Sequence, residues 1–369
     1  MAGAASAQAH DANSWGGLFR SRDDGAAWLS ADAGIFVGAA LAVAVSPTDA
    51  NHLLYGTDTR LLRSRNAGRD WVTEAPAQFQ GPTLAVAFAA DGERAWAATP
   101  SGVFAFADAA WRRSNVPDDA IPGRALTIGT RPGRVYLLGS VGLYASSDHG
   151  RTFDRVGTMD LPNAAGSALL MLPGPEEALF AVFDGRVWAS FDEGVSWAPR
   201  DAGMPPGRIE TIVSDPDAAR RLWAVSSSRL YGSEDLGVTW HLRGDPIGEG
   251  DLTIRGMAAT RAGSLIMLAT HKGLLRSHDG GHTWNQVEGA LPVHLEAGPL
   301  LRDPHDAQTI YSGFSLVPYA ELRRRAEQGA NLLSRLDPVS VAGAAAFLLL
   351  LLIGGWSGAR RLAHAYRDI

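Results

Sequence analysis

Residues 274–284 read Leu274-Leu275-Arg276-Ser277-His278-Asp279-Gly280-Gly281-His282-Thr283-Trp284, and the order Ser-x-Asp-x-Gly within them returns along the chain. Five more copies begin at Ser21, Ser64, Ser146, Ser190 and Ser233. A shortened copy over 103–111 has lost its Ser and Gly. Every copy leads to an aromatic residue, and these recur at intervals of 40 to 44 residues: Trp28, Trp71, Trp111, Phe153, Trp197, Trp240 and Trp284. A period of this length is typical of β-propeller blades.

Each repeat contains four short apolar runs that are separated by Gly, Pro, Asp and Ser, as expected of a four-stranded antiparallel meander. The repeat over 41–76 shows this most clearly. Its expected strands are 41–45, 53–56, 61–64 and a fourth that begins at Trp71. The Ser-x-Asp-x-Gly motif therefore lies in the turn between the third and fourth strands. There a carboxylate can accept backbone N–H groups, and Gly can supply a positive φ.

The two ends of the repeat region each supply half a blade. Residues 18–21 and 27–29 read as a third and a fourth strand, whereas 298–304 and 309–313 read as a first and a second. Pairing the two halves in one sheet would remove the free edges of an open array. The sequence therefore predicts an all-β, seven-bladed propeller over 14–318, with six whole blades and one shared blade. The six are expected at 41–76, 84–116, 125–157, 167–202, 209–243 and 254–288.

The composition changes after the propeller. Residues 319–337 are rich in Ala, Glu, Leu and Arg at helical spacing, which predicts a juxtamembrane helix. Residues 338–359 then run without a charge and include Phe347 to Ile353. At about 1.5 Å per residue such a helix spans roughly 33 Å, enough to cross a hydrocarbon core of about 30 Å. We expect one C-terminal transmembrane helix, followed by a short basic tail over 360–369.

The first residues bear on membrane orientation. Residues 1–13 are rich in small side chains and resemble the end of a secretory signal, but they lack its apolar core and basic head. Arg360 and Arg361 lie close behind the expected span, and Arg335 lies before it. This charge balance and the signal-like start favour a cytoplasmic-membrane protein with its propeller on the periplasmic side. Without a signal, the same chain would be tail-anchored with its propeller in the cytoplasm.

Charge and composition exclude some functions. The formal net charge is −6, which argues against nucleic-acid binding because phosphate affinity requires clustered positive charge. The chain has no Cys, so it has no disulfides or thiolate metal sites. His271, His278, His282 and His294 lie close together in sequence, but two of them flank a turn and we expect them to be solvated. His10 would chelate copper only if processing made it the N-terminal residue. We therefore expect no metal and no cofactor.

The repeated motif resembles the Asp-box (BNR) repeats of sialidase-like propellers, and the resemblance covers about 18–313. Asp-box propellers include sialidases, glucan hydrolases, sortilin-type receptors and the photosystem II assembly/stability factor family. A seven-bladed ring of short repeats without large insertions is most similar to the last of these. The resemblance implies that the box residues stabilise the fold. These residues are Asp23, Asn66, Asp148, Asp192, Asp235 and Asp279, and Asn66 suits that role because an amide can hold a turn.

Two alternatives follow from the same resemblance. Sialidases need an arginine triad whose first member lies in an Arg-Ile-Pro-like stretch near the N-terminus, and none occurs here; Arg208-Ile209 lies mid-chain. A glycosidase needs only two carboxylates across the bond, for which Asp58 and Asp184 in second-to-third-strand turns are candidates. Sortilin-type receptors add a Cys-rich module that this chain lacks. The enzymatic alternative is thus a glycan-binding or glycoside-hydrolysing protein.

Cations recur just before the third strand of several blades. Aligning the repeats brings Arg60, Arg186 and Arg229 to equivalent positions, with Lys272 one place earlier. We call these four residues the cationic arc, because they should share the end of the ring opposite the Asp-bearing turns. Such an arc would bind acidic segments of a protein partner through charge-assisted hydrogen bonds. The sequence thus favours a non-enzymatic, membrane-anchored assembly or scaffold factor.

Overall fold

The computed structural model describes residues 16–322, except 33–34, 158–167, 173–177, 206–208, 249–251, 261–262, 290, 293 and 319–320. These residues form seven four-stranded antiparallel sheets, and each sheet is one blade of a propeller. The fold class predicted from the repeats is therefore confirmed for this part of the chain. Residues 1–13, the expected helix at 319–337, the expected transmembrane helix at 338–359 and the tail at 360–369 lie outside the described residues, apart from fragments of the first helix.

The first three blades follow the predicted order of strands. Blade 1 contains β3 (Ala40–Val45), β4 (Leu53–Thr57), β5 (Leu61–Ser64) and β6 (Val72–Thr73). Blade 2 contains β7 (Ala85–Phe88), β8 (Ala95–Thr99), β9 (Gly102–Ala107) and β10 (Ala110–Arg113), followed by the 3-10 helix η1 (Asp118–Ala120). Blade 3 contains β11 (Ala125–Ile128), β12 (Val135–Leu138), β13 (Leu143–Ser146) and β14 (Asp154–Arg155).

The remaining blades repeat the pattern. Blade 4 contains β15 (Ala168–Leu172), β16 (Ala178–Phe183), β17 (Arg186–Ser190) and β18 (Ala198–Pro199). Blade 5 contains β19 (Ile209–Ser214), β20 (Leu222–Ser226), β21 (Arg229–Ser233) and β22 (His241–Arg243). Blade 6 contains β23 (Ile254–Thr260), β24 (Leu265–Thr270), β25 (Gly273–Ser277) and β26 (Asn285–Gln286). Blade 7 contains β27 (Glu296–Arg302), β28 (Ile310–Ser315), β1 (Gly17–Ser21) and β2 (Leu29–Ser30).

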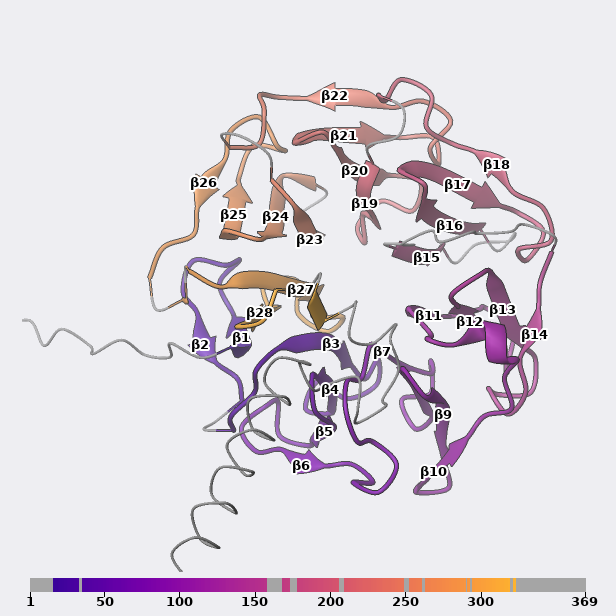
Figure 1. The fold of residues 1–369 in the computed structure, drawn as a ribbon. Helices are drawn as coiled ribbons and strands as arrows, with labels where there is room; N and C mark the ends of the chain where they lie inside the picture. The colour runs from indigo at the N-terminus through magenta and orange to yellow at the C-terminus, as the bar shows by residue number, and fades with distance from the viewer. Residues whose placement is uncertain are drawn as a thin grey trace, which may run out of the picture. The chain divides into compact units, whose positions relative to one another are not determined.

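The blades form a closed ring (Figure 1). The first strand of each blade contacts the first strand of the next, from β3 through β7, β11, β15, β19 and β23 to β27, and β27 contacts β3 again. Because each sheet is an antiparallel meander, its first-to-second and third-to-fourth turns lie at one end of the ring. The second-to-third turns lie at the other end. Side chains in turns at the same end of the ring can therefore contribute to one surface, whereas those at opposite ends cannot.

Blade 7 joins the two ends of the repeat region, as the sequence predicted. Its strand order is β2-β1-β28-β27, so β1 from the start of the chain pairs with β28 from near its end. In that pairing Phe19 lies opposite Ser312 and Arg20 lies opposite Tyr311. No other sheet combines strands from both ends of the described chain. The ring is therefore held shut by one antiparallel strand pair and its side chains.

The core lies between the blades and not in one central mass. Buried apolar side chains form a cluster at each junction between neighbouring blades. All five residues of β4 are buried, since a neighbouring blade covers each face of its sheet. Tyr55 in blade 1, Tyr136 and Tyr144 in blade 3, and Tyr311 in blade 7 are fully buried. Sheet-on-sheet packing around the ring therefore provides the apolar burial that stabilises the fold.

Two of the aromatic residues that mark the repeat also link neighbouring blades through hydrogen bonds. The indole Nε1–H of Trp71 donates to the carbonyl of Ala31 (2.8 Å), and that of Trp240 donates to the carbonyl of Arg200 (2.7 Å). In both pairs the acceptor belongs to the preceding blade. The predicted fourth strand of blade 1 begins at Val72 and not at Trp71. Trp71 therefore precedes the strand and reaches across the junction.

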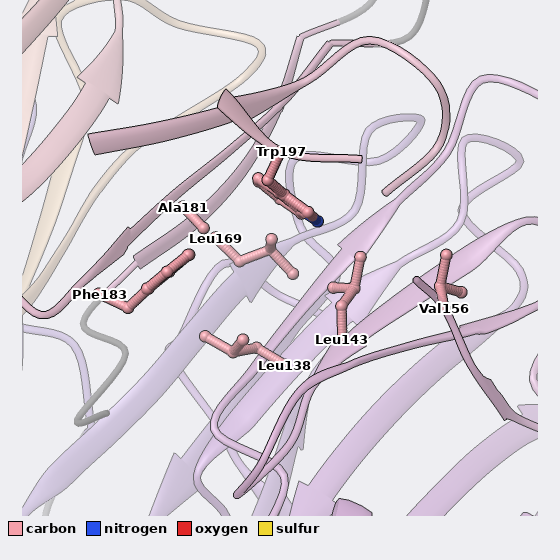
Figure 2. A pocket seen from close by; sticks show the side chains of 7 residues that line it. All are labelled: Leu138, Leu143, Val156, Leu169, Ala181, Phe183 and Trp197. Carbon is pink, nitrogen blue, oxygen red and sulfur yellow. The ribbon is translucent and has the colours of Figure 1, made fainter. Parts of the chain in front are cut away.

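A small void lies in the core between blades 3 and 4 (Figure 2). Leu138, Leu143 and Val156 line it from blade 3, and Leu169, Ala181, Phe183 and Trp197 line it from blade 4. Its volume is about 10 Å³, the lower limit for holding one water molecule. The indole Nε1–H of Trp197 donates to the carbonyl of Gly194 (3.0 Å), so the void gains no polar partner from it. We treat it as part of the core.

The predicted membrane span falls on residues that the structure does not describe. Among the described residues, no helix has the length and apolar character that crossing a bilayer requires.

Candidate functional site

Six turns contain the repeated Ser-x-Asp-x-Gly residues, and we call them the Ser-Asp-Gly turns. In blade 6, the Ser277 hydroxyl donates to Asp279 Oδ1 (2.7 Å) and accepts the N–H of Gly281 (2.8 Å). Asp279 also accepts the N–H and the hydroxyl of Thr283. The pattern returns with small changes in the other five turns, around Asp23, Asn66, Asp148, Asp192 and Asp235.

The turns also require their glycines. The last two residues of each motif have positive φ, as Leu236 (60°) and Gly237 (77°) do in blade 5. In blade 3, a Cβ on Gly150 would lie 2.1 Å from the Nε1 of Trp96 in blade 2. Glycine is therefore needed both for the left-handed conformation and for close contact with the preceding blade.

Hydrogen bonds stabilise the charged form of the turn carboxylates. The Thr239 N–H is the main cause that lowers the pKa of Asp235 to about 2, and the Thr239 and Ser233 hydroxyls add to it. Although burial opposes ionisation, the N–H and hydroxyl of Thr152 lower the pKa of Asp148 to about 2. The carboxylate oxygens are thus engaged within their own turns. Asn66 engages its turn in the same way, since its Oδ1 accepts the N–H of Asp70 (2.8 Å).

Substitutions at Asp235 test the role of these turns. We expect Asp235→Ala to lower the free energy of unfolding by about 1–2 kcal/mol, because the Thr239 N–H and two hydroxyls lose their acceptor. Asp235→Asn should cost about half as much, since Asn66 already fills this position in blade 1. The contribution of Asp235 should be present above about pH 4 and be lost as pH falls toward 2, and Asn should remove this pH dependence. Urea unfolding at several pH values measures both effects; equal losses for Ala and Asn would contradict them.

The cationic arc lies at the end of the ring that carries the second-to-third turns, on blades 1, 4, 5 and 6. Arg60 precedes β5, Arg186 and Arg229 begin β17 and β21, and Lys272 precedes β25. Arg186 forms a two-pronged ion pair with Asp201 (2.6 and 2.9 Å) and lies 5.4 Å from the centre of the Trp188 ring. The charge of Arg186 is therefore largely neutralised by Asp201 in the same blade. Lys272 is exposed, and Arg60 and Arg229 are half-buried.

The carboxylates proposed for glycoside hydrolysis lie on blades that are not neighbours. Asp58 lies in blade 1 and accepts the backbone N–H of Ala39 (3.2 Å), whereas Asp184 lies in blade 4. These blades are three places apart in a ring of seven. Glycosidases hold their two carboxyl groups within about 10 Å of each other. Positions three blades apart are therefore unfavourable for the action of Asp58 and Asp184 on one glycosidic bond.

The histidines of blade 6 do not form a metal site. His271 Nδ1 accepts the N–H of Thr253 (3.1 Å), and the ring of His282 contacts the carbonyl of Asp279. Within the described part of the chain, no group of three or more His, Asp or Glu side chains is arranged to hold a metal ion.

A cleft of about 690 Å³ surrounds the outer strands of blade 2, and sequence reasoning did not predict it. We call it the arginine cleft. Blade 1 contributes His52 and Arg65, and blade 3 contributes residues 149–151. Blade 2 contributes residues 92–94, 105–109 and 112–114. Five arginines line the cleft against two carboxylates: Arg65, Arg94, Arg112, Arg113 and Arg151, with Glu93 and Asp108.

The ion pairs within the cleft are exposed. Arg94 pairs with Asp91 (2.8 Å) and contacts the ring of His149, and Arg112 pairs with Asp108 (3.3 Å). The side chains of Arg112 and Asp108 are 62% and 83% exposed. Such pairs contribute little net free energy, so a ligand can replace the internal partner at small cost. Arg151 has no side-chain hydrogen bond or ion pair to the described residues.

A buried polar network lies behind the cleft. Arg63 pairs with Glu74 (2.8 Å) and contacts the Nε2 of His52 (2.6 Å), and its guanidinium lies 4.2 Å from the centre of the Phe106 ring. Burial lowers the pKa of His52 to about 4, and the nearby charges of Arg65 and Arg63 act in the same direction. His52 is therefore neutral near pH 7 and does not add to the charge of the cleft.

Comparison with known proteins identifies solved structures with the same fold. YCF48 bound to D1 peptide is 17% identical with a TM-score of 0.57, and the match covers 76% of this chain and 94% of that one. YCF48 from Cyanidioschyzon merolae is 15% identical with a TM-score of 0.58, covering 75% and 96%. A GH74 xyloglucanase from Xanthomonas campestris is 19% identical with a TM-score of 0.56, covering 75% of this chain but 53% of the enzyme. No protein-family model and no curated relative matches the chain. At sequence identities of 15% to 19%, these structural matches establish a shared propeller fold and no more.

Proposed function

We propose that this chain is a non-enzymatic propeller that binds a protein partner as an assembly or scaffold factor for a membrane or exported complex. The observation that carries the proposal is the chemistry of the arginine cleft. Five arginines, and no buried carboxylate pair, face that cleft. Its two acids, Glu93 and Asp108, are exposed. Catalytic acids of glycosidases are instead held in environments that keep the proton on the carboxyl group.

The structural comparisons support the same proposal. YCF48 is a propeller of matching extent, and one of its structures holds a D1 peptide. The rival activity, glycan binding or glycoside hydrolysis, draws support from the xyloglucanase likeness. This chain spans only about half of that enzyme. A protein-binding role therefore fits the whole described ring better.

We further propose that residues 338–359 anchor the propeller in the cytoplasmic membrane, with the ring on the periplasmic side. This part of the proposal rests on the uncharged run of 22 residues and on the arginines that follow it. Carbonate extraction of membranes that contain the full chain, or a chain truncated after 337, would test the anchor. Protease added to intact spheroplasts would test on which side of the membrane the propeller lies, because only a periplasmic propeller would be cleaved.

Capture of partners tests the proposed function. The tagged full chain, solubilised from membranes in mild detergent, should retain one partner in stoichiometric amount, and that partner should recover the propeller in a reciprocal capture. Charge reversal at Arg60, Arg186 and Arg229 tests whether the cationic arc is the docking surface; an unchanged partner would exclude the arc. Release of sugars from xyloglucan by the purified chain, with no partner in either capture, would favour the hydrolase instead.

A further inference from the structure

The arginine cleft lies at the one whole blade that lacks a Ser-Asp-Gly turn. In blade 2 the third and fourth strands are joined by two residues alone, Asp108 (φ 51°) and Ala109 (φ 59°). Two consecutive residues with positive φ form the tight hairpin turn that matches strand twist. In blade 1 the equivalent connection runs from Ser64 to Val72. The residues of the short hairpin line the cleft in place of that longer turn.

The charge of the cleft opposes that of the whole chain. The chain has a net charge of −6, yet five arginines from three blades line the cleft with two acids, and a third acid, Asp91, pairs with Arg94 beside it. Arg65, Arg112 and Arg151 are exposed. Fields from exposed charges extend about 8–10 Å in physiological salt. A short anionic ligand would therefore experience the local arginines, whereas a long polyanion would also meet the acidic surface beyond them.

The cleft also has an apolar floor. Ala105, Phe106 and Ala107 line it and are half-buried, and Ala109 lies at the turn. Phe106 is held from behind by Arg63 and packs against Trp111, with ring centres 5.3 Å apart. An aromatic ring fixed in this way offers apolar surface to a ligand at low entropic cost. Phosphate or free carboxylate ligands would leave this floor uncovered.

A second cleft of about 410 Å³ shares Arg113 and Ser114 with the first, so the surface continues along β10. The Ser114 hydroxyl is buried and has no hydrogen-bond partner in the described part of the chain. Arginine guanidinium groups and an unpaired hydroxyl can both donate hydrogen bonds to carboxylates and to peptide carbonyls. The two clefts adjoin at the end of β10, an arrangement that suits an extended segment.

We propose that the arginine cleft binds a short acidic segment of a protein partner, with carboxylates on its arginines and an intervening apolar side chain on the Phe106 floor. This inference rests on the proposed protein-binding function and adds the surface and the chemistry of the ligand. Arg65, Arg112 and Arg151 supply the contacts at the rim.

Fluorescence anisotropy tests the ligand class. The probe is a fluorescein-labelled peptide of alternating Glu and Leu, and the matched control peptide has Gln in place of Glu. The full chain in detergent should bind the Glu peptide at least tenfold more tightly, and raising the salt should weaken that binding. Equal binding of both peptides would overturn the proposal. Tighter binding of an oligo-dT strand or of vesicles containing phosphatidylglycerol would overturn it too, since the ligand would then be a phosphate-bearing polymer or surface.

Matched variants test the site. The double variant Arg112→Ala/Arg151→Ala should weaken binding of the Glu peptide by roughly tenfold or more, because two charge-assisted contacts are lost. The control Arg22→Ala/Arg220→Ala removes the same charge from exposed arginines at the same end of the ring, in blades 7 and 5, and should change binding less than twofold. All four side chains are exposed, so both variants should fold. Equal losses in the two variants would show that net charge, and not the cleft, is responsible.

The capture experiment separates this inference from the function on which it rests. If the wild-type chain and the Arg112→Ala/Arg151→Ala variant retain the same partner equally, the cleft proposal fails and the protein-binding function stands. If no partner is retained by wild type while the peptide results hold, the function fails and the anion-binding cleft stands.

Discussion

Phe314→Ala should lower the free energy of unfolding by about 3–5 kcal/mol, as expected for removing a buried aromatic side chain. Phe314 is fully buried in β28, and its ring meets that of Phe19 edge-on, with centres 5.2 Å apart. Phe19 lies in β1, so this contact crosses the strand pair that joins the two ends of the chain. The same core cluster includes Trp28, Met267 and Ile310, and it binds blade 7 to blade 6. Urea unfolding of the full chain in detergent, followed by tryptophan fluorescence, measures the loss.

Leu29→Ala is the matched control for this prediction. Leu29 belongs to β2 of the same blade, but it is 71% exposed, so its truncation should change stability by less than about 0.5 kcal/mol. Similar losses for Phe314→Ala and Leu29→Ala would mean that closure of the ring contributes little. A ring held by one strand pair should instead lose its cooperativity when that pair is weakened.

The fold could be predicted because the information is local and repeated. Each motif places Ser, Asp and Gly at fixed spacing, and each turn is closed by hydrogen bonds that span at most four residues, such as those from Gly281 to Ser277. The aromatic residue that follows sets the start of the outer strand to within one residue. The pairing of the strand that contains Phe19 with the second strand of blade 7 followed from counting strands, and β1 does pair with β28.

The arginine cleft could not be predicted in the same way. Its residues come from three blades, and Arg65 and Arg151 are far apart in the sequence. Only the shortened copy at 103–111 signalled the site, because the short hairpin that replaces the longer turn there lines the cleft. The cationic arc shows a second limit of sequence alignment. Aligning the blades identified Arg186, but it did not identify Asp201, whose carboxylate lies fifteen residues further on and neutralises Arg186. An alignment of repeats shows which residues occupy equivalent positions, whereas the formation of an ion pair also depends on the direction of each side chain.

Arg63→Met should also lower the free energy of unfolding, by about 3–5 kcal/mol, because it leaves a carboxylate buried without its cation. The side chains of Arg63 and Glu74 are 7% and 14% exposed, and their atoms pair at 2.8 and 2.9 Å. Burial opposes ionisation of Glu74, but hydrogen bonds from Arg63 and Trp111 outweigh it and hold the pKa of Glu74 below its usual value. Because methionine keeps most of the apolar contact with Phe106, the loss of stability should come mainly from removal of the Arg63 charge.

A second variant separates charge from packing at this position. In Arg63→Met/Glu74→Gln the amide oxygen can still accept the indole N–H of Trp111, and no unpaired charge remains, so at least half of the lost stability should return. The deficit of Arg63→Met should shrink as pH falls. In that variant burial without Arg63 favours the protonated form of Glu74, so its penalty is lost as pH falls toward about 4.5. In wild type Arg63 and Trp111 lower the pKa of Glu74, so the stabilisation by the ion pair is lost below about 4.5. Arg112→Ala, which breaks the exposed pair with Asp108, should cost less than about 1 kcal/mol at any pH. If the double variant were as unstable as Arg63→Met, the loss would come from packing behind Phe106, and the floor of the arginine cleft would depend on the shape of Arg63 and not on its charge.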